Sequence, residues 1–199
     1  MRRAAWVLAY HGCDKEVGEK ILSGEKDIVL SRNSWDWLGE GAYFWEYSYS
    51  RALAWAKFLQ SRPDIAKIPI KEPFVIGAII DPGNCLDLSE DGSLQIVKEA
   101  HSNLKLIFKI LKQPMPKNEE GHKSDRDLVK RKLDCYIINY LHRMRKRRKQ
   151  PRFDTIRCPF MEGGELFEGS KFHAKTHLQW CVRDPKRQVW GYFRPRQVE

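Results

Sequence analysis

The chain has 199 residues, with 36 Lys and Arg side chains against 26 Asp and Glu side chains, so its formal net charge at neutral pH is +10. Hydrophobic residues make up 42% of the sequence and aromatic residues 12%, which excludes intrinsic disorder as the main state and suffices for one domain with a substantial core. No apolar run approaches the roughly 18 residues that a membrane span requires. The short apolar stretch 4–10 is followed at once by polar His11, so we expect a buried strand there rather than a signal peptide.

The cysteines and histidines indicate neither a disulfide framework nor a metal site. The five cysteines are an odd number and are widely spaced, which favours the reducing cytoplasm as the location. His173 and His177 are four residues apart, but no acidic or cysteine set lies near them in the sequence. We therefore expect no bound metal.

Most of the excess positive charge comes from one short stretch. Residues 1–139 have a net charge of +1 (21 basic, 20 acidic) and residues 153–199 of +2 (8 basic, 6 acidic), whereas residues 140–152 have seven basic side chains and no acidic one. Such a patch attracts polyanions by releasing their counterions, although basic residues at a helix end also suit the helix dipole. We refer to it as the basic segment, and its cations are our candidate nucleic-acid contacts: Arg143, Arg145, Lys146, Arg147, Arg148, Lys149 and Arg152.

In the first part of the chain, short apolar runs alternate with helical periodicity. Helices are expected at 14–22 and from Ser48 or Ser50, either of which could cap the helix, to about residue 60. Strands are expected at 4–10, 27–31, 42–45 and 74–80, the last being a continuous apolar run closed by the turn sequence Asp81-Pro82-Gly83-Asn84.

The second part of the chain predicts a helical pair followed by strands. Helices are expected at 89–112 and 124–148, the second opening with Ser124-Asp125-Arg126-Asp127, which resembles a capping box. Strands are expected at 155–160, 176–182 and 189–194. Strands, an inserted helical pair at about 89–150, and strands again are typical of a single α+β domain.

Two segments together carry a resemblance to a known family. Tyr10-His11-Gly12-Cys13 ends the first expected strand, and Gly39-Glu40-Gly41-Ala42-Tyr43-Phe44 follows about thirty residues later, with Ser50 and Trp55 beyond it. This arrangement resembles the His-Tyr-Glu type of ADP-ribosyltransferases, which include poly-ADP-ribose polymerases, diphtheria-like toxins and small bacterial proteins. Residues 176–183 fall where the third motif strand of that family lies. The resemblance covers about half of the chain and implies a split β-sheet core.

The resemblance implies that NAD is a substrate and assigns roles to five residues. His11 would contact a ribose hydroxyl, and the backbone of Gly12 would bind the nicotinamide amide at close approach. Tyr43 would stack on the nicotinamide ring, Trp55 would close its other face, and Ser50 would bind the amide. Taken alone, Trp55 is equally a core residue on an apolar helix face, and Ser50 could be a helix cap only.

The third motif departs from the family pattern. The family places a glutamate at the head of that strand, whereas the matching residue here is Gln179, which can bind a ribose hydroxyl but brings no charge to the transition state. A glutamate of the preceding glycine-rich loop could supply the charge instead, with Glu162 ahead of Glu165 and Glu168. The catalytic candidates are therefore Gln179, Glu162 and Tyr43.

We expect an NAD-dependent mono-ADP-ribosyltransferase. The basic segment makes nucleic acid the favoured acceptor, with RNA ahead of DNA. The family implies a toxin of a toxin–antitoxin or phage-defence system and a possible antitoxin protein as a partner. Two alternatives remain open: a transferase that acts on a protein, and an inactive module that binds NAD or nucleic acid.

Overall fold

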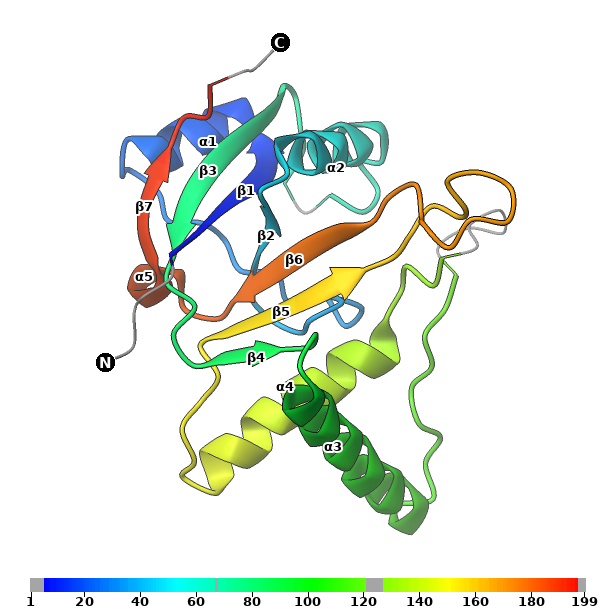
Figure 1. Cartoon of the computed structure of the whole chain (residues 1–199). Coiled ribbons are helices and arrows are strands. Elements are labelled where there is room, and N and C mark those ends of the chain that lie inside the picture. Colours follow the sequence, from blue (N-terminus) through cyan, green and yellow to red (C-terminus); the bar gives the residue numbers. More distant parts are fainter. Residues whose placement is uncertain (1–5, 67, 121–126, 197–199) are drawn as a thin grey trace.

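The computed structural model describes residues 6–66, 68–120 and 127–196, and within these ranges the strands form one seven-stranded sheet. The strand order is β4-β5-β6-β2-β1-β3-β7 (Figure 1). The pair β4–β5 is parallel and the other neighbouring pairs are antiparallel. The strands are β1 (Val7–Asp14), β2 (Ala42–Glu46), β3 (Pro73–Ile80), β4 (Cys85–Asp87), β5 (Thr155–Phe160), β6 (His177–Val182) and β7 (Val189–Phe193).

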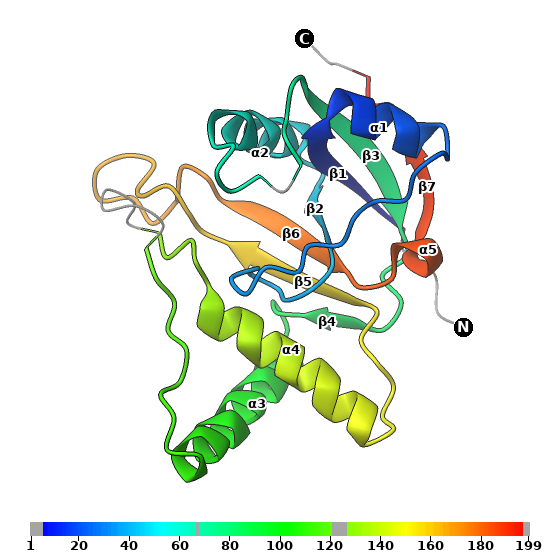
Figure 2. The ribbon, with the colours of Figure 1, turned by 180° about the vertical axis from the view of Figure 1, so that it is seen from behind.

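Helices cover both faces of this sheet. Helices α1 (Lys15–Leu22) and α2 (Tyr49–Ser61) lie on opposite sides of β1 and β3, as the two views in Figures 1 and 2 show. Helices α3 (Asp91–Ile110) and α4 (Lys132–Arg147) cross each other next to β4 and β5, at the other end of the sheet. A single turn, α5 (Pro185–Gln188), leads into β7.

The core consists of layers on the two faces of the sheet. On the α1 side, Phe44, Ile76 and Trp180 pack together with the partly buried Val17 of α1. On the other face, Tyr43 and Cys181 pack against α3 and α4, while Trp45 packs with Ala52 of α2. Because side chains alternate along a strand, Tyr43 and Trp45 share this second face and Phe44 lies on the first.

The paired region between β1 and β2 is short. These strands pair only at Ala9 with Glu46 and at Tyr10 with Trp45, and then separate toward His11 and Tyr43. Asp14 ends β1 and caps α1, since its carboxylate accepts a hydrogen bond from the backbone N–H of Glu16 (3.1 Å). The same carboxylate accepts from the N–H of Lys71 (2.7 Å), which ties the segment before β3 to this cap.

An ion cluster ties β2, β4 and β5 together on the α1 side. The Arg157 guanidinium lies 2.7 Å from a Glu46 oxygen and 3.1 Å from an Asp87 oxygen, and all three side chains are largely buried. The indole of Trp180 donates to the same Glu46 oxygen at 2.7 Å. This cluster joins residues that are far apart in the sequence.

The mixed α+β class predicted from the sequence is confirmed, as are the strands near 74–80, 155–160, 177–182 and 189–193 and the helix near 91–110. The strand expected at 27–31 is wrong: this stretch is irregular, and Ser31 forms an isolated bridge with Gly41. The second helix of the pair begins at Lys132 rather than Ser124, because Lys130 pairs with Glu119 before the helix starts. Residues 124–126 of the expected capping box lie outside the described residues.

Among the helices of the described ranges, none is both long and apolar enough to cross a membrane. The same ranges contain no cluster of three or more His, Cys, Asp or Glu side chains arranged to hold a metal ion.

Candidate functional site

The three motif segments lie on three adjacent strands. His11 is on β1, Tyr43 on β2 and Gln179 on β6, and the sheet places β2 between the other two. The imidazole Nδ1 of His11 lies 2.8 Å from the carbonyl oxygen of Tyr43 and donates to it, which bridges the two diverging strands. On the other side of β2, Gln179 pairs in register with Trp45. The fold thus brings together segments that are separated by more than a hundred residues.

The side chains of His11 and Tyr43 nevertheless face opposite sides of the sheet. The His11 ring lies 5.7 Å from that of Phe44, in the layer on the α1 side. The Tyr43 ring belongs to the layer beneath α4, where its hydroxyl donates to the Gly39 carbonyl (2.5 Å) and accepts from the Leu38 N–H (3.0 Å). In this arrangement Tyr43 holds the turn that precedes β2.

Gly12 is in close contact with α2. A Cβ atom at this position would lie 2.0 Å from the carbonyl oxygen of Ala52 and 3.3 Å from the Cβ of Ala56. The absence of a side chain at Gly12 is what lets α2 rest on β1. The side of Gly12 on which a Cβ would stand is therefore occupied by α2.

The two remaining predicted NAD contacts lie on α2. Trp55 is 41% exposed, stacks on Phe58 with ring centroids 5.5 Å apart, and lies 6.1 Å from the Trp45 ring. Ser50 is exposed, and the helix is capped instead by Ser48, whose hydroxyl accepts from the Arg51 N–H at 3.4 Å. Trp55 therefore borders the face that carries Trp45 and Gln179.

A buried polar cluster lies on that face, and we call it the Glu162 cluster: Glu162, Arg51, His177, Gln179 and Trp45. Glu162 comes from the loop before β6, and its Oε2 lies 3.4 Å from Arg51 Nη2 and 3.5 Å from His177 Nδ1. His177 and Gln179 are two residues apart on β6 and so share a face. Both side chains are less than a tenth exposed.

The Glu162 cluster has an unusual number of unpaired polar atoms. Within the described part of the chain, four of its buried atoms meet no protein hydrogen-bond partner: Trp45 Nε1, Arg51 Nε, His177 Nε2 and Gln179 Oε1. Native structures leave few buried polar atoms unpaired, because each one costs desolvation free energy. Four such atoms in one cluster offer donors and acceptors to a polar ligand.

Burial sets the protonation of this cluster. It raises the pKa of Glu162, and the positive charge of Arg51 opposes that shift. It lowers the pKa of His177, and the guanidinium of Arg51 acts in the same direction. The Nδ1–H of His177 donates to the Lys175 carbonyl at 2.9 Å, which leaves Nε2 as an acceptor. His177 is thus a neutral imidazole with an available lone pair.

Arg131 and two aromatic rings close the other side of the cluster. The Arg131 guanidinium lies 3.8 Å from the Trp37 ring centroid and 4.8 Å from that of Phe160, and the Phe160 centroid is 5.6 Å from the His177 ring. The stacked cation adds positive potential to a site that already contains Arg51.

The sequence interpretation missed Arg51, Arg131 and the role of His177. His177 could have been found, because it lies two residues before Gln179 on the same predicted strand and must share its face. Arg51 directly follows Ser50 in the motif. Arg131 has no local signal, since its position depends on a contact with Trp37, which lies 94 positions earlier in the printed sequence.

The basic segment occupies the last turns of α4 and the turn that follows, but its cations are not equivalent. Arg152 pairs with Asp154 and Asp184, both at 3.2 Å, and Arg145 donates to the Pro151 carbonyl at 2.6 Å. Within the described residues, no ion pair involves the other cations of the segment: Arg143, Lys146, Arg147, Arg148 and Lys149. Together with Arg145, whose carbonyl partner does not neutralise its charge, these five provide the uncompensated charge.

Comparison with known proteins adds one relative. The chain is similar to the uncharacterized protein MJ0359 of Methanocaldococcus jannaschii, with 25% identity over 202 residues that span 91% of this chain and 85% of that protein. No family model matches the chain. No solved structure matches it either. The similarity thus extends over nearly the whole chain, and the relative's name states no activity.

Proposed function

We propose that this protein is an NAD-dependent ADP-ribosyltransferase whose reaction takes place at the Glu162 cluster and whose acceptor is nucleic acid, with RNA favoured over DNA. The observation that carries the proposal is the placement of the three motif segments on adjacent strands β1, β2 and β6, with Gln179 Oε1 as one of the four unpaired polar atoms of the Glu162 cluster. The split sheet core of that family is part of the same proposal. The short pairing between β1 and β2, which then separate, supports it.

The chemistry requires a site that favours a cationic ribose. The bond between the ribose C1 and the nicotinamide nitrogen breaks, its electron pair leaves with nicotinamide, and positive charge develops on the ribose. Gln179 accepts a hydrogen bond from a ribose hydroxyl through Oε1, and the Glu162 carboxylate stabilises the charge at short range. Arg51 lies 3.4 Å from that carboxylate, and its positive charge favours the ionised form of Glu162 against the effect of burial, which raises the Glu162 pKa.

The second half of the reaction needs an acceptor and a base. A nucleophile of the acceptor forms a bond to the ribose C1 and releases a proton, which His177 Nε2 takes up. The basic segment holds the phosphates of the acceptor in place, which positions it without reading its sequence. The same arrangement allows NAD hydrolysis when water replaces the acceptor.

The test is incubation of the protein with adenylate-labelled NAD and separate pools of RNA, DNA and protein. We expect label in RNA and release of nicotinamide. Glu162→Gln and Gln179→Ala should each lower the rate at least about tenfold, which corresponds to about 1.4 kcal/mol of lost transition-state stabilisation. Glu168→Gln is the matched control, since it removes one carboxylate from the exposed part of the same loop.

The outcomes separate the candidate functions. Label in the protein pool alone would replace the nucleic-acid acceptor with a protein. Binding of NAD without nicotinamide release would indicate a binding module. Turnover that is unaffected by Glu162→Gln and Gln179→Ala alike would refute the Glu162 cluster as the reaction site. Growth arrest on expression of the wild type, but not of the double variant, would support a toxin.

A further inference from the structure

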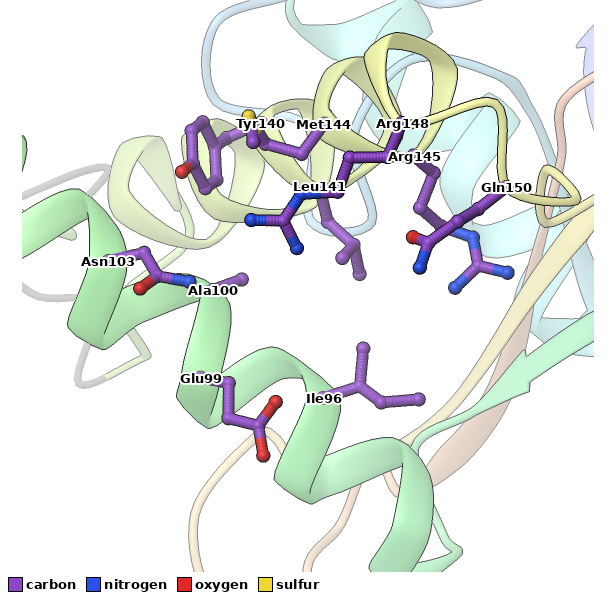
Figure 3. Close-up of a pocket in the computed structure, with 10 residues that line it drawn as sticks. All are labelled: Ile96, Glu99, Ala100, Asn103, Tyr140, Leu141, Met144, Arg145, Arg148 and Gln150. Atoms are coloured by element: carbon purple, nitrogen blue, oxygen red, sulfur yellow. The ribbon is translucent and has the colours of Figure 1, made fainter.

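A groove between α3 and α4 is partly lined by Arg145 and Arg148 of the basic segment, and none of its lining residues belongs to the Glu162 cluster (Figure 3). We propose that this groove binds one unstacked nucleobase of a single-stranded nucleic acid and prefers bases with an exocyclic amino group. The inference rests on the nucleic-acid part of the proposed function and is independent of the transfer chemistry.

The shape of the groove suits a single ring system. Its volume is about 190 Å³, and four apolar side chains contribute to a lining that is otherwise polar: Ile96, Ala100, Leu141 and Met144. Sites for drug-sized ligands measure about 300–1,000 Å³, so this groove is too small for a whole dinucleotide such as NAD. These apolar side chains can contact the face of one base, since every base has an apolar π-face, while the polar side chains around them can bind its edge.

The rim provides groups that can bind the edge of a base. Glu99 and Asn103 project from α3, and Tyr140 projects from α4 (Figure 3). The Glu99 Oε1 accepts a hydrogen bond from Gln95 at 3.0 Å, and within the described residues its other oxygen accepts none. A carboxylate accepts from amino groups such as N4 of cytosine and repels the carbonyl oxygen that uracil has at that position.

Cations lie where the backbone of such a ligand would run. Arg148 belongs to the groove itself, and Figure 3 shows its guanidinium directed from α4 across the space toward α3. Lys146, Arg147 and Lys149 continue the positive surface beyond it and are exposed. An acidic protein segment would bring its carboxylates against Glu99, whereas a nucleotide brings an amino-bearing base to Glu99 and keeps its phosphate near the cations.

The experiment measures binding of labelled oligocytidine and oligouridine of equal length to the full chain by fluorescence anisotropy, without NAD, at several salt concentrations. We expect oligocytidine to bind about five- to tenfold more tightly, the difference made by one hydrogen bond of ordinary net strength, because Glu99 is exposed to water. The affinity for both should fall with salt, with a slope near −0.7 for each phosphate contacted.

Two pairs of variants test the groove itself. Glu99→Ala should abolish the preference for cytidine and strengthen the binding of oligouridine, because a negative charge is lost. Glu90→Ala removes the same charge at the start of α3, outside the groove, and should leave the preference unchanged. Arg148→Gln should weaken the binding of both oligonucleotides and flatten the salt slope more than Lys171→Gln, an exposed change on the loop before β6.

Equal affinity of the wild type for the two oligonucleotides, or a preference that survives Glu99→Ala, would overturn the groove as the binding site. If unlabelled oligoglutamate displaces the labelled oligocytidine as efficiently as unlabelled oligocytidine does, binding depends on charge alone. That result would also overturn the groove as a nucleobase site. The binding assay contains no NAD, so it tests the groove separately from the transfer reaction. If the oligonucleotides bind as expected but no ADP-ribosyl transfer is observed, the proposed reaction is refuted and the groove is not.

Discussion

Replacing Gly12 with alanine separates a packing role from a ligand-binding role at this position. The added Cβ would lie 2.0 Å from the Ala52 carbonyl oxygen, whereas ordinary contacts begin at about 3.4 Å, so the oxygen must retreat by about 1.4 Å. That oxygen belongs to α2, whose residues Ala52 and Ala56 are fully buried. The whole first turn of α2 must therefore shift, because packed interiors do not yield locally.

The cost should be at the upper end of overpacking effects, about 3 kcal/mol. For a chain of this size each kcal/mol lowers the melting temperature by about 2–4 °C, so Gly12→Ala should melt about 6–12 °C below the wild type. The assay is thermal and urea unfolding followed by far-UV circular dichroism. Gly92→Ala is the control, since a Cβ there meets nothing within 4 Å and alanine favours the helix.

A Gly12→Ala protein that melts within about 1 °C of the wild type would refute the packing argument. Unchanged stability combined with lost NAD affinity would instead restore the role that the family resemblance gives to Gly12. We expect Gly12→Ala to lower both the stability and the NAD affinity, because displacement of α2 also moves Trp55 and Arg51.

Three further predictions concern charged groups. Burial raises the pKa of Glu162, so the free energy of unfolding of the wild type falls as the pH rises and this carboxyl ionises in the folded protein. Glu162→Gln lacks this loss. Its free energy of unfolding, measured in urea titrations, should therefore increase relative to that of the wild type between pH 4 and pH 8. Burial lowers the pKa of His142 to about 3, so the folded protein keeps this ring neutral while the unfolded chain takes up a proton below about pH 6.5. Between these two pKa values the free energy of unfolding of the wild type should therefore fall by about 1.4 kcal/mol per pH unit of acidification because of this group. His142→Phe should remove that contribution to the slope. His101→Phe, on the partly exposed surface of α3, should not. Arg157→Met leaves two largely buried carboxylates without a cation and should cost about 3 kcal/mol in unfolding free energy. Arg62→Met breaks an exposed pair and should cost less than about 1 kcal/mol; equal costs would contradict the cluster's role.

Local pattern was sufficient for most secondary structure. The apolar run 74–80 became the strand Pro73–Ile80, and the helical periodicity of 89–112 became α3. These elements are determined by the spacing of apolar side chains along a short stretch of chain, which the sequence shows directly. The stretch 27–31 is the counterexample: it is apolar and strand-like, but its backbone forms only an isolated bridge, because the strands of the sheet are paired with other neighbours.

The composition of the candidate site was only partly predictable. The motifs pointed to His11, Tyr43 and Gln179, and these residues do lie on adjacent strands. Which way each side chain points depends on the register of long-range pairing, and that pairing puts His11 and Tyr43 on opposite faces. A shift of one residue in register would reverse this, and no local pattern specifies it.

The sequence shows how many charged side chains the protein has, and the tertiary structure decides which of them are paired. The seven cations of the basic segment are plain from the sequence, but only the fold pairs Arg152 with Asp184 and turns Arg145 toward Pro151. Likewise Arg51 and Glu162 are 111 positions apart, and they meet because α2 and the loop before β6 converge on one face of the sheet. Electrostatic partners are chosen by distance in space, so the sequence determined the number of charges and the tertiary contacts determined which of them remain available to a ligand.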